Sequence, residues 1–251
     1  MKRYPTGILD LDSQIGGGFP EGSVILLLED PGAEAEILSF YFVVEGLKKN
    51  EKALYITTDD TMEEIKESLK VYFNIPENIS EKIKFIDLMS SRIVGGCKSF
   101  GSIPSIYGDA HNQVINGIFK ECYDRIVLNN LAYFTKNYDR DTVMNLLENL
   151  SIYVKRKKSV VLILLPKGLL DSSYEVAIKH VVDGVIEMSI VEAENEVQRR
   201  IKILKLKRTI VPKSIFRYEI TDKGISLESV KRIIRHPLRP EGQASDTEMV
   251  L

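Results

Sequence analysis

Residues 24–47 read VILLLEDPGAEAEILSFYFVVEGL and carry three successive structural signals. The uninterrupted apolar run at residues 24–28 predicts a buried β-strand. Residues 30–32 (DPG) are turn formers, and apolar residues then return at helical spacing over about residues 37–48. A strand, a tight turn and a helix in this order predict one unit of an α/β domain.

The turn lies where nucleotide-binding proteins carry G-x-x-x-x-G-K-[ST], a loop whose backbone amides, lysine and hydroxyl hold phosphates and Mg²⁺. In this chain the eight residues at that place are Glu29, Asp30, Pro31, Gly32, Ala33, Glu34, Ala35 and Glu36, and they miss every fixed position. Glu34 stands at the last glycine, Ala35 at the lysine and Glu36 at the hydroxyl. The loop therefore has the position of a phosphate-binding loop but lacks the residues that bind phosphate and Mg²⁺.

The acids of this loop bring a formal charge of about −4 toward a triphosphate that carries about −4 itself. At ~6 Å and an effective dielectric near 20, each like-charge pair costs on the order of 3 kcal/mol. We therefore expect binding of ATP and Mg²⁺ to be lost, with no cofactor and no metal site. Two interpretations of the acids stay open: they suit the positive end of a helix, or Glu34 or Glu36 occupies the amide nest in place of a phosphate.

The composition is that of a globular domain: 251 residues, 44% hydrophobic, 28% charged, with a net charge of −2. A net charge of −2 does not favour binding of the whole domain to nucleic acid or to an anionic membrane. No segment predicts a signal peptide or a membrane span, so we expect a cytoplasmic protein. The two cysteines and three histidines are scattered, which favours reduced thiols and structural histidines: Cys97, Cys122, His111, His180 and His236.

Elsewhere, apolar runs predict strands over residues 53–57, 83–88, 125–128, 160–165, 183–190, 199–207 and 216–220, and periodic segments predict helices over 62–73, 111–123, 141–156 and 174–182. Residues 89–109 are rich in glycine and serine and predict a long surface loop. Residues 192–198 predict a hairpin tip. The basic run 155–158 is typical of a helix C-terminus, with a nucleic-acid or partner patch as the alternative.

Two sets of residues outside the loop form recognisable patterns. The first set precedes the loop and reads T-G-x-x-x-L-D and G-G-G-x-x-x-G-S: Thr6, Gly7, Leu11, Asp12, Gly16, Gly17, Gly18, Gly22 and Ser23. The second set lies in the late strands: Lys205, Leu206, Thr209, Tyr218, Ile220, Thr221, Gly224 and Ile225. In these patterns and their order the chain resembles the RecA superfamily, in its KaiC-like and RadA-like branch, over residues 6–227.

This resemblance implies one RecA-like α/β domain of the P-loop NTPase class. It would contain a mostly parallel twisted sheet flanked by helices, with antiparallel strands at one edge. We expect this domain to span residues 1–233 and residues 234–251 to form a flexible tail.

The resemblance also implies roles for polar residues at strand ends. The family carries two glutamates after the second strand, one of which polarises the attacking water, and Asp59 and Asp60 match them as vestigial catalytic positions. The alternative is that Thr58 or Thr61 caps the next helix and the aspartates suit its dipole. Asn129 replaces the aspartate that holds Mg²⁺. Pro166 and Lys167 follow the strand that carries the γ-phosphate sensor in relatives.

In the family, late basic residues reach the nucleotide of the neighbouring subunit. The corresponding candidates for a subunit or nucleic-acid contact are Lys205, Lys207, Arg208, Lys231, Arg232 and Arg235. Ordinary solvated strand residues are the alternative for Lys205 and Lys207.

Together these features predict a catalytically inactive RecA/KaiC-like homologue, a pseudo-ATPase that serves as a regulatory or structural subunit. Its partner would be itself or an active paralogue, in DNA repair or in signal transduction. One alternative is a DNA-binding accessory protein of recombination. The other is an enzyme with a rearranged site in which Glu34, Glu36, Asp59 and Asp60 hold a divalent cation.

Overall fold

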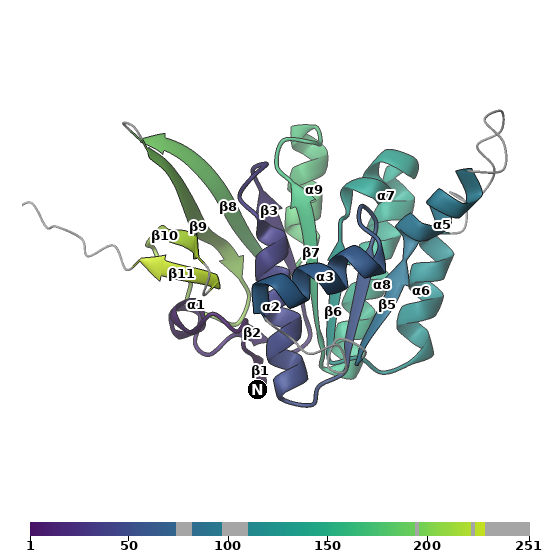
Figure 1. Ribbon diagram of the computed structural model, residues 1–251, viewed down its shortest axis with the longest axis horizontal. Coiled ribbons are helices and arrows are strands. Elements are labelled where there is room, and N and C mark those ends of the chain that lie inside the picture. The colour runs from purple at the N-terminus through teal and green to yellow at the C-terminus, as the bar shows by residue number, and fades with distance from the viewer. Residues whose placement is uncertain (74–81, 97–109, 194–195, 222–223, 229–251) are drawn as a thin grey trace, which may run out of the picture.

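The computed structural model describes residues 1–73, 82–96, 110–193, 196–221 and 224–228. Within them, a nine-stranded sheet has the order β11-β10-β9-β8-β3-β7-β6-β4-β5 (Figure 1). Its strands are β3 (Ser23–Glu29), β4 (Ala53–Thr57), β5 (Ile83–Asp87), β6 (Arg125–Asn129), β7 (Val160–Pro166), β8 (Gly184–Ala193), β9 (Glu196–Leu206), β10 (Phe216–Thr221) and β11 (Gly224–Glu228). The short strands β1 (Arg3–Tyr4) and β2 (Phe19–Pro20) pair separately.

The sheet is parallel from β5 to β8 and antiparallel from β8 to β11. This confirms the predicted fold class, including the antiparallel strands at one edge. β3 lies between β7 and β8 and is buried over almost its whole length, as its continuous apolar sequence requires. Residues 24–28 therefore lie in a central strand of the sheet.

Helices cover both faces of this sheet. They are α1 (Leu9–Gln14), α2 (Ala35–Lys48), α3 (Met62–Phe73), α5 (Leu88–Gly96), α6 (Ala110–Lys120), α7 (Ala132–Asn137), α8 (Arg140–Lys157) and α9 (Ser172–Val181). Because side chains alternate along a strand, Ile25 and Leu27 pack in one apolar cluster with α2 and α3. Leu26 and Leu28 pack in the other cluster, with α6, α8 and α9. Figure 1 shows α2 and α3 in front of the sheet.

Several predicted boundaries are wrong. Residues 88–96 form α5, so the predicted loop of residues 89–109 begins as a helix, and its part from 97 to 109 lies outside the described residues. The predicted hairpin tip is too long, because Glu192 pairs with Val197 and Ala193 with Glu196. The sequence pattern also missed α7, which has only six residues, and β11.

The basic run at residues 155–158 closes α8, which confirms that it ends a helix. Lys158 takes a left-handed conformation with φ of 56°, and the backbone amide at this cap donates to the carbonyl of Val154. At the other end of α8, Asp139 accepts a hydrogen bond from the amide of Thr142 at 2.7 Å. None of the described helices is long and apolar enough to cross a membrane. The expected tail, residues 234–251, lies outside the described residues.

Candidate functional site

The loop that follows β3 and the polar residues that follow β4 and β6 lie at one edge of the sheet. Parallel neighbours end at the same edge, and β3, β7, β6 and β4 are consecutive in the strand order. This arrangement brings Glu36, Asn129 and Asp60 near one another. Ligands of open α/β sheets bind at this carboxyl-end edge, so it is the first place to look for a site.

Within the loop, Glu29 is the acid that accepts a hydrogen bond from a backbone amide of the loop itself, that of Ala35. The acceptor is Oε2 of Glu29, 2.9 Å from the amide nitrogen. The suggestion that Glu34 or Glu36 fills this place is wrong. Glu29 is the last residue of β3, and its side chain lies across the turn from the start of α2. Burial raises the pKa of the Glu29 carboxyl, and the hydrogen bond from Ala35 opposes that rise.

Glu36 belongs to a buried polar network. Its Oε1 accepts from Nδ2 of Asn129 at 2.5 Å, and the same nitrogen lies 3.2 Å from the Tyr55 hydroxyl. Ser39 hydrogen-bonds that hydroxyl at 3.0 Å. Burial raises the pKa of Glu36 to about 7, with the neighbouring Asp60 as the next cause, while the Asn129 bond lowers it in part. The amide of Asn129 thus binds a carboxylate of the same chain.

Asp59 and Asp60 have separate roles at the end of β4. Asp59 accepts from Nδ2 of Asn130 at 2.7 Å and from the Thr58 hydroxyl at 3.2 Å. Burial raises the pKa of Asp60, and the charges of Glu64 and Asp59 add to this.

The alternative that Thr61 caps the following helix is confirmed. Glu64 accepts from the Thr61 amide at 2.8 Å, and the Glu64 amide donates back to the Thr61 hydroxyl at 3.3 Å. This reciprocal pair is a capping box at the start of α3.

The antiparallel strands hold the outer side of the loop. From β9, Arg199 donates through Nε to the carbonyl of Gly32 at 3.1 Å and through Nη2 to Oε1 of Glu34 at 3.2 Å. From β10, the hydroxyl of Tyr218 donates to the carbonyl of Ala33. Sequence reasoning missed Arg199 and saw Tyr218 only as part of a pattern, since neither contact could be read without the pairing of β9 with β10.

Asp30 ties the same loop to its neighbours. Its Oδ2 accepts from the amide of Ile190 at 3.1 Å, and its Oδ1 lies 3.9 Å from Nζ of Lys167. Lys167 makes a closer ion pair with Glu187 at 2.7 Å. Lys167 therefore neutralises acids of β8 and of the loop.

Glu34 also has an unusual backbone. It takes the left-handed region, with φ of 58° and ψ of 47°, at the position before α2. Non-glycine side chains adopt this region at a cost, and Glu34 stands where the phosphate motif carries its last glycine. Contacts from Arg199 hold the residue in this conformation.

The basic candidates in the described part of the chain bind groups of the chain itself. Lys205 donates to three carbonyls at the end of α9, those of Lys179, His180 and Val182. Lys207 pairs with Asp183 at 3.0 Å, and Arg208 donates to Ser23 at 2.8 Å. A subunit or nucleic-acid contact at these residues stays a prediction. The other candidates, Lys231, Arg232 and Arg235, lie outside the described residues.

The alternative divalent-cation site does not form among the residues that the structure describes. They contain no group of three or more histidine, cysteine, aspartate or glutamate side chains placed to hold a metal ion. Glu34 points away to Arg199, and Glu36 binds Asn129.

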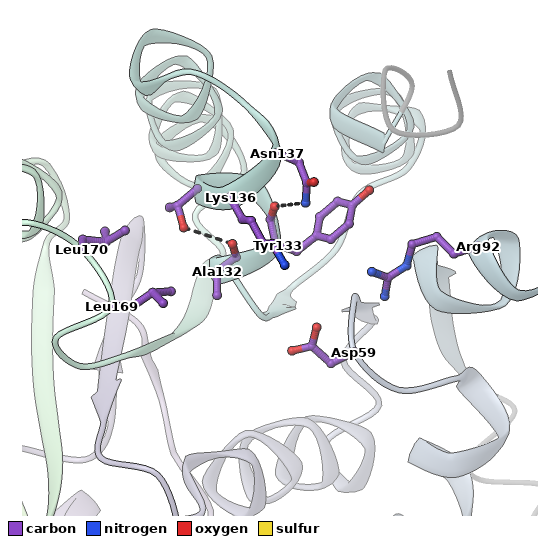
Figure 2. A pocket seen from close by; sticks show the side chains of 9 residues that line it. Asp59, Arg92, Ala132, Tyr133, Lys136, Asn137, Leu169 and Leu170 are labelled. Atoms are coloured by element: carbon purple, nitrogen blue, oxygen red, sulfur yellow. Dashed lines mark hydrogen bonds between the residues drawn. The ribbon is translucent and has the colours of Figure 1, made fainter. Parts of the chain in front are cut away.

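A cavity of about 430 Å³ opens at the same edge, further along the sheet (Figure 2). Its walls come from the segments that follow β4, β6 and β7 and from α5. The lining residues are Asp59, Arg92, Ala132, Tyr133, Thr135, Lys136, Asn137, Leu169 and Leu170. Sequence reasoning singled out only Asp59 among them, because α7 was not predicted.

Comparison with known proteins finds relatives that match most of this chain. A UPF0273 protein of Thermotoga maritima is 24% identical over 239 residues, which cover 90% of this chain and 95% of the relative. The circadian clock oscillator protein KaiC of Rippkaea orientalis is 21% identical over 231 residues, which cover 90% of this chain but 42% of that protein.

A solved KaiC-like protein from the archaeon Pyrococcus horikoshii OT3 superimposes with a TM-score of 0.73 at 18% identity, covering 91% of this chain and 99% of that one. The family model described as "ATPase: KaiC" matches residues 4–232. The chain belongs to the KaiC ATPase family.

Proposed function

We propose that this protein is a KaiC-family homologue without ATP chemistry, which acts as a regulatory or structural subunit. One observation carries the proposal. The loop amide of Ala35 and the side-chain amide of Asn129 are both bonded to carboxylates of the same chain, Glu29 and Glu36. Ligand phosphate would have to displace the first, and hydrated Mg²⁺ the second.

The family implies ATP and Mg²⁺, and the residues present do not fit them. Position 35 has no ammonium group for the outer phosphates, and position 36 has no hydroxyl for the metal. Asn129 directs an N–H donor toward Glu36, whereas Mg²⁺ requires oxygen ligands. The carboxylates of the loop would repel the phosphates. We therefore derive no reaction step through a nucleotide.

Exposed apolar residues in the turn after β9 support a protein partner. Ile210 is 95% exposed and Ile215 is 43% exposed. They follow Lys205, Leu206 and Thr209, the residues that resemble the family's subunit-contacting motif. Burial of these side chains against a second copy of the chain, or against an active relative, would remove apolar surface from water.

Equilibrium binding of labelled ATP with Mg²⁺ tests the loss of nucleotide chemistry. We expect no saturable binding up to millimolar nucleotide and no phosphate release. The matched control is the triple variant Ala35→Lys, Glu36→Thr, Asn129→Asp, which supplies the lysine, the hydroxyl and the Mg²⁺-binding carboxylate of the phosphate-loop motifs and should gain affinity. Micromolar affinity of the unmodified protein together with turnover would refute the proposal.

The proposed subunit role has a separate test. Sedimentation velocity of the protein alone, and mixed with KaiC-family ATPases of the same cell, should reveal a complex that Ile210→Ser weakens. A protein that stays monomeric in every mixture would contradict this part of the proposal and leave the nucleotide experiment unaffected.

A further inference from the structure

The cavity of Figure 2 lies in the position where open α/β sheets bind ligands. Asp59 follows β4, Ala132 follows β6, and Leu169 follows β7. These strands are adjacent in the order β7-β6-β4 and parallel. A crevice beyond the carboxyl ends of such strands is the usual ligand site of this architecture, and about 430 Å³ is within the ordinary range for small-molecule pockets.

Arg92 brings an unpaired charge into the cavity. Its Nη2 donates to the carbonyl of Thr58 and lies 2.9 Å from Sδ of Met89. Its Nε is buried and has no hydrogen-bond partner. The guanidinium lies 4.9 Å from the ring centroid of Tyr133, which holds it in place, and no carboxylate in the described part of the chain forms an ion pair with it. The guanidinium therefore leaves a positive charge at the cavity that no acid of the described residues neutralises in an ion pair.

Lys136 adds a second cation. Its side chain points into the space between Arg92 and Leu169 in Figure 2. Among the described residues it has no ion-pair partner. Asp59 is the acid of the lining, and its oxygens already accept hydrogen bonds from Asn130 and Thr58. Arg92, Lys136 and Asp59 together give the lining a net charge of +1.

The opposite wall is apolar. Leu169 is 52% exposed, and Leu170 and Ala132 also line the cavity. A cavity lined by two cations and by aliphatic side chains matches a ligand that carries both an anionic group and an apolar part.

We propose that this cavity binds a small organic anion, with one carboxylate or phosphate group at Arg92 and Lys136 and a short apolar body against Leu169 and Leu170. A nucleoside triphosphate does not match, because two cations beside Asp59 cannot neutralise about four negative charges. The inference does not depend on the loop after β3 or on the proposed loss of ATP chemistry.

Titration calorimetry at low ionic strength with phenyl phosphate, hexanoate and inorganic phosphate tests the site. We expect saturable binding of one equivalent of at least one organic probe. Lys136→Gln should weaken that binding about tenfold, since it removes a charged hydrogen-bond donor to the anionic group. Leu169→Ser should weaken the organic probes and leave inorganic phosphate unchanged.

Lys157→Gln is the control, because it removes an exposed lysine at the end of α8, at the opposite edge of the sheet. It should bind as the unmodified protein does. Lys136 is exposed and forms no hydrogen bond or ion pair with the described residues, so we expect its substitution to leave the fold intact. Arg92→Gln serves as a second variant, with folding checked by circular dichroism. No saturable binding of either organic probe, or equal affinity of the Lys136→Gln variant, would overturn the proposal. So would preferential binding of a single-stranded oligonucleotide that depends on Lys136.

Discussion

The loop between β3 and α2 and the cavity beside Arg92 lie at the same edge of one sheet, but their charges are satisfied differently. In the loop, each of the acids Glu29, Glu34 and Glu36 accepts a hydrogen bond from a donor of the same chain. In the cavity, Arg92 retains a buried N–H without a partner. Acids that accept hydrogen bonds within the chain contribute to stability, whereas a guanidinium without an ion pair is available to an anionic ligand.

The largest effect is expected from Tyr218→Ala. Tyr218 is 2% exposed and its hydroxyl donates to the carbonyl of Ala33. Removing a buried aromatic side chain should lower the free energy of unfolding by about 3–5 kcal/mol, measured by urea denaturation. Tyr218→Phe removes the hydroxyl alone and should cost about 1 kcal/mol. A loss below about 1 kcal/mol for the alanine variant would mean that β10 does not hold the loop.

Glu36→Gln should stabilise the protein at high pH. The pKa of Glu36 is about 7 in the folded state and near 4.5 when unperturbed, so the folded state holds the proton more tightly. The stability that this proton contributes is complete below about pH 4.5 and is lost as the pH rises to about 7. At pH 8 the free energy of unfolding of the variant should be about 1–3 kcal/mol higher than that of the unmodified protein. The reason is that glutamine carries no charge to bury and still accepts a hydrogen bond from Asn129.

At pH 4.5 the Glu36→Gln variant and the unmodified protein should have nearly the same free energy of unfolding, and this comparison is the internal control. Glu63→Gln removes an exposed acid of α3 and should leave the pH dependence unchanged. If the gain at pH 8 persists at pH 4.5, the titration of Glu36 is not its cause.

Glu29→Ala should lower the free energy of unfolding by about 1–2 kcal/mol, since the amide of Ala35 loses its acceptor. Glu29→Gln retains an acceptor oxygen and should lose less. Thermal or urea unfolding of both variants measures the two losses in free energy of unfolding. Equal losses would show that the hydrogen bond to Ala35 is not what Glu29 supplies.

Arg199→Gln should have the smallest effect, about 0.5–1 kcal/mol. The side chains of Arg199 and Glu34 are 31% and 38% exposed, and partly exposed ion pairs contribute little. Added salt should reduce the difference between the variant and the unmodified protein. Lys202→Gln, an exposed position on the same strand, should show no such salt dependence.

The sequence predicted the elements whose physical signal is local. The helix at residues 62–73 and the strand at 53–57 agree with α3 and β4 at both ends, because periodicity and the Thr61–Glu64 cap mark their limits. α7 was missed because six residues contain too little periodicity. The pairing of β8 with β9 sets the length of both strands. This pairing depends on contacts between the strands and cannot be read from the local sequence of residues 192–198.

The candidate site was predicted in its residues but not in its partners. The departures at Ala35, Glu36 and Asn129 can be read directly from the sequence. That Glu29, rather than Glu34, accepts from the loop amide depends on where β3 ends and how the turn is folded. The contact of Arg199 joins residues 165 positions apart, and the cavity requires α5, α7 and the segment after β7 together. Neither could be derived from spacing in the chain.

The left-handed backbone at Glu34 has a consequence for reversing the changes in the loop. At this point the main chain already has the dihedral angles that glycine tolerates best, so Glu34→Gly needs no remodelling of the turn. Under the proposed loss of nucleotide binding, the obstacles to phosphate are then the side chains of the loop and not the path of its main chain. An engineer who wished to regain a nucleotide site could begin from this scaffold with point substitutions and leave every loop length unaltered.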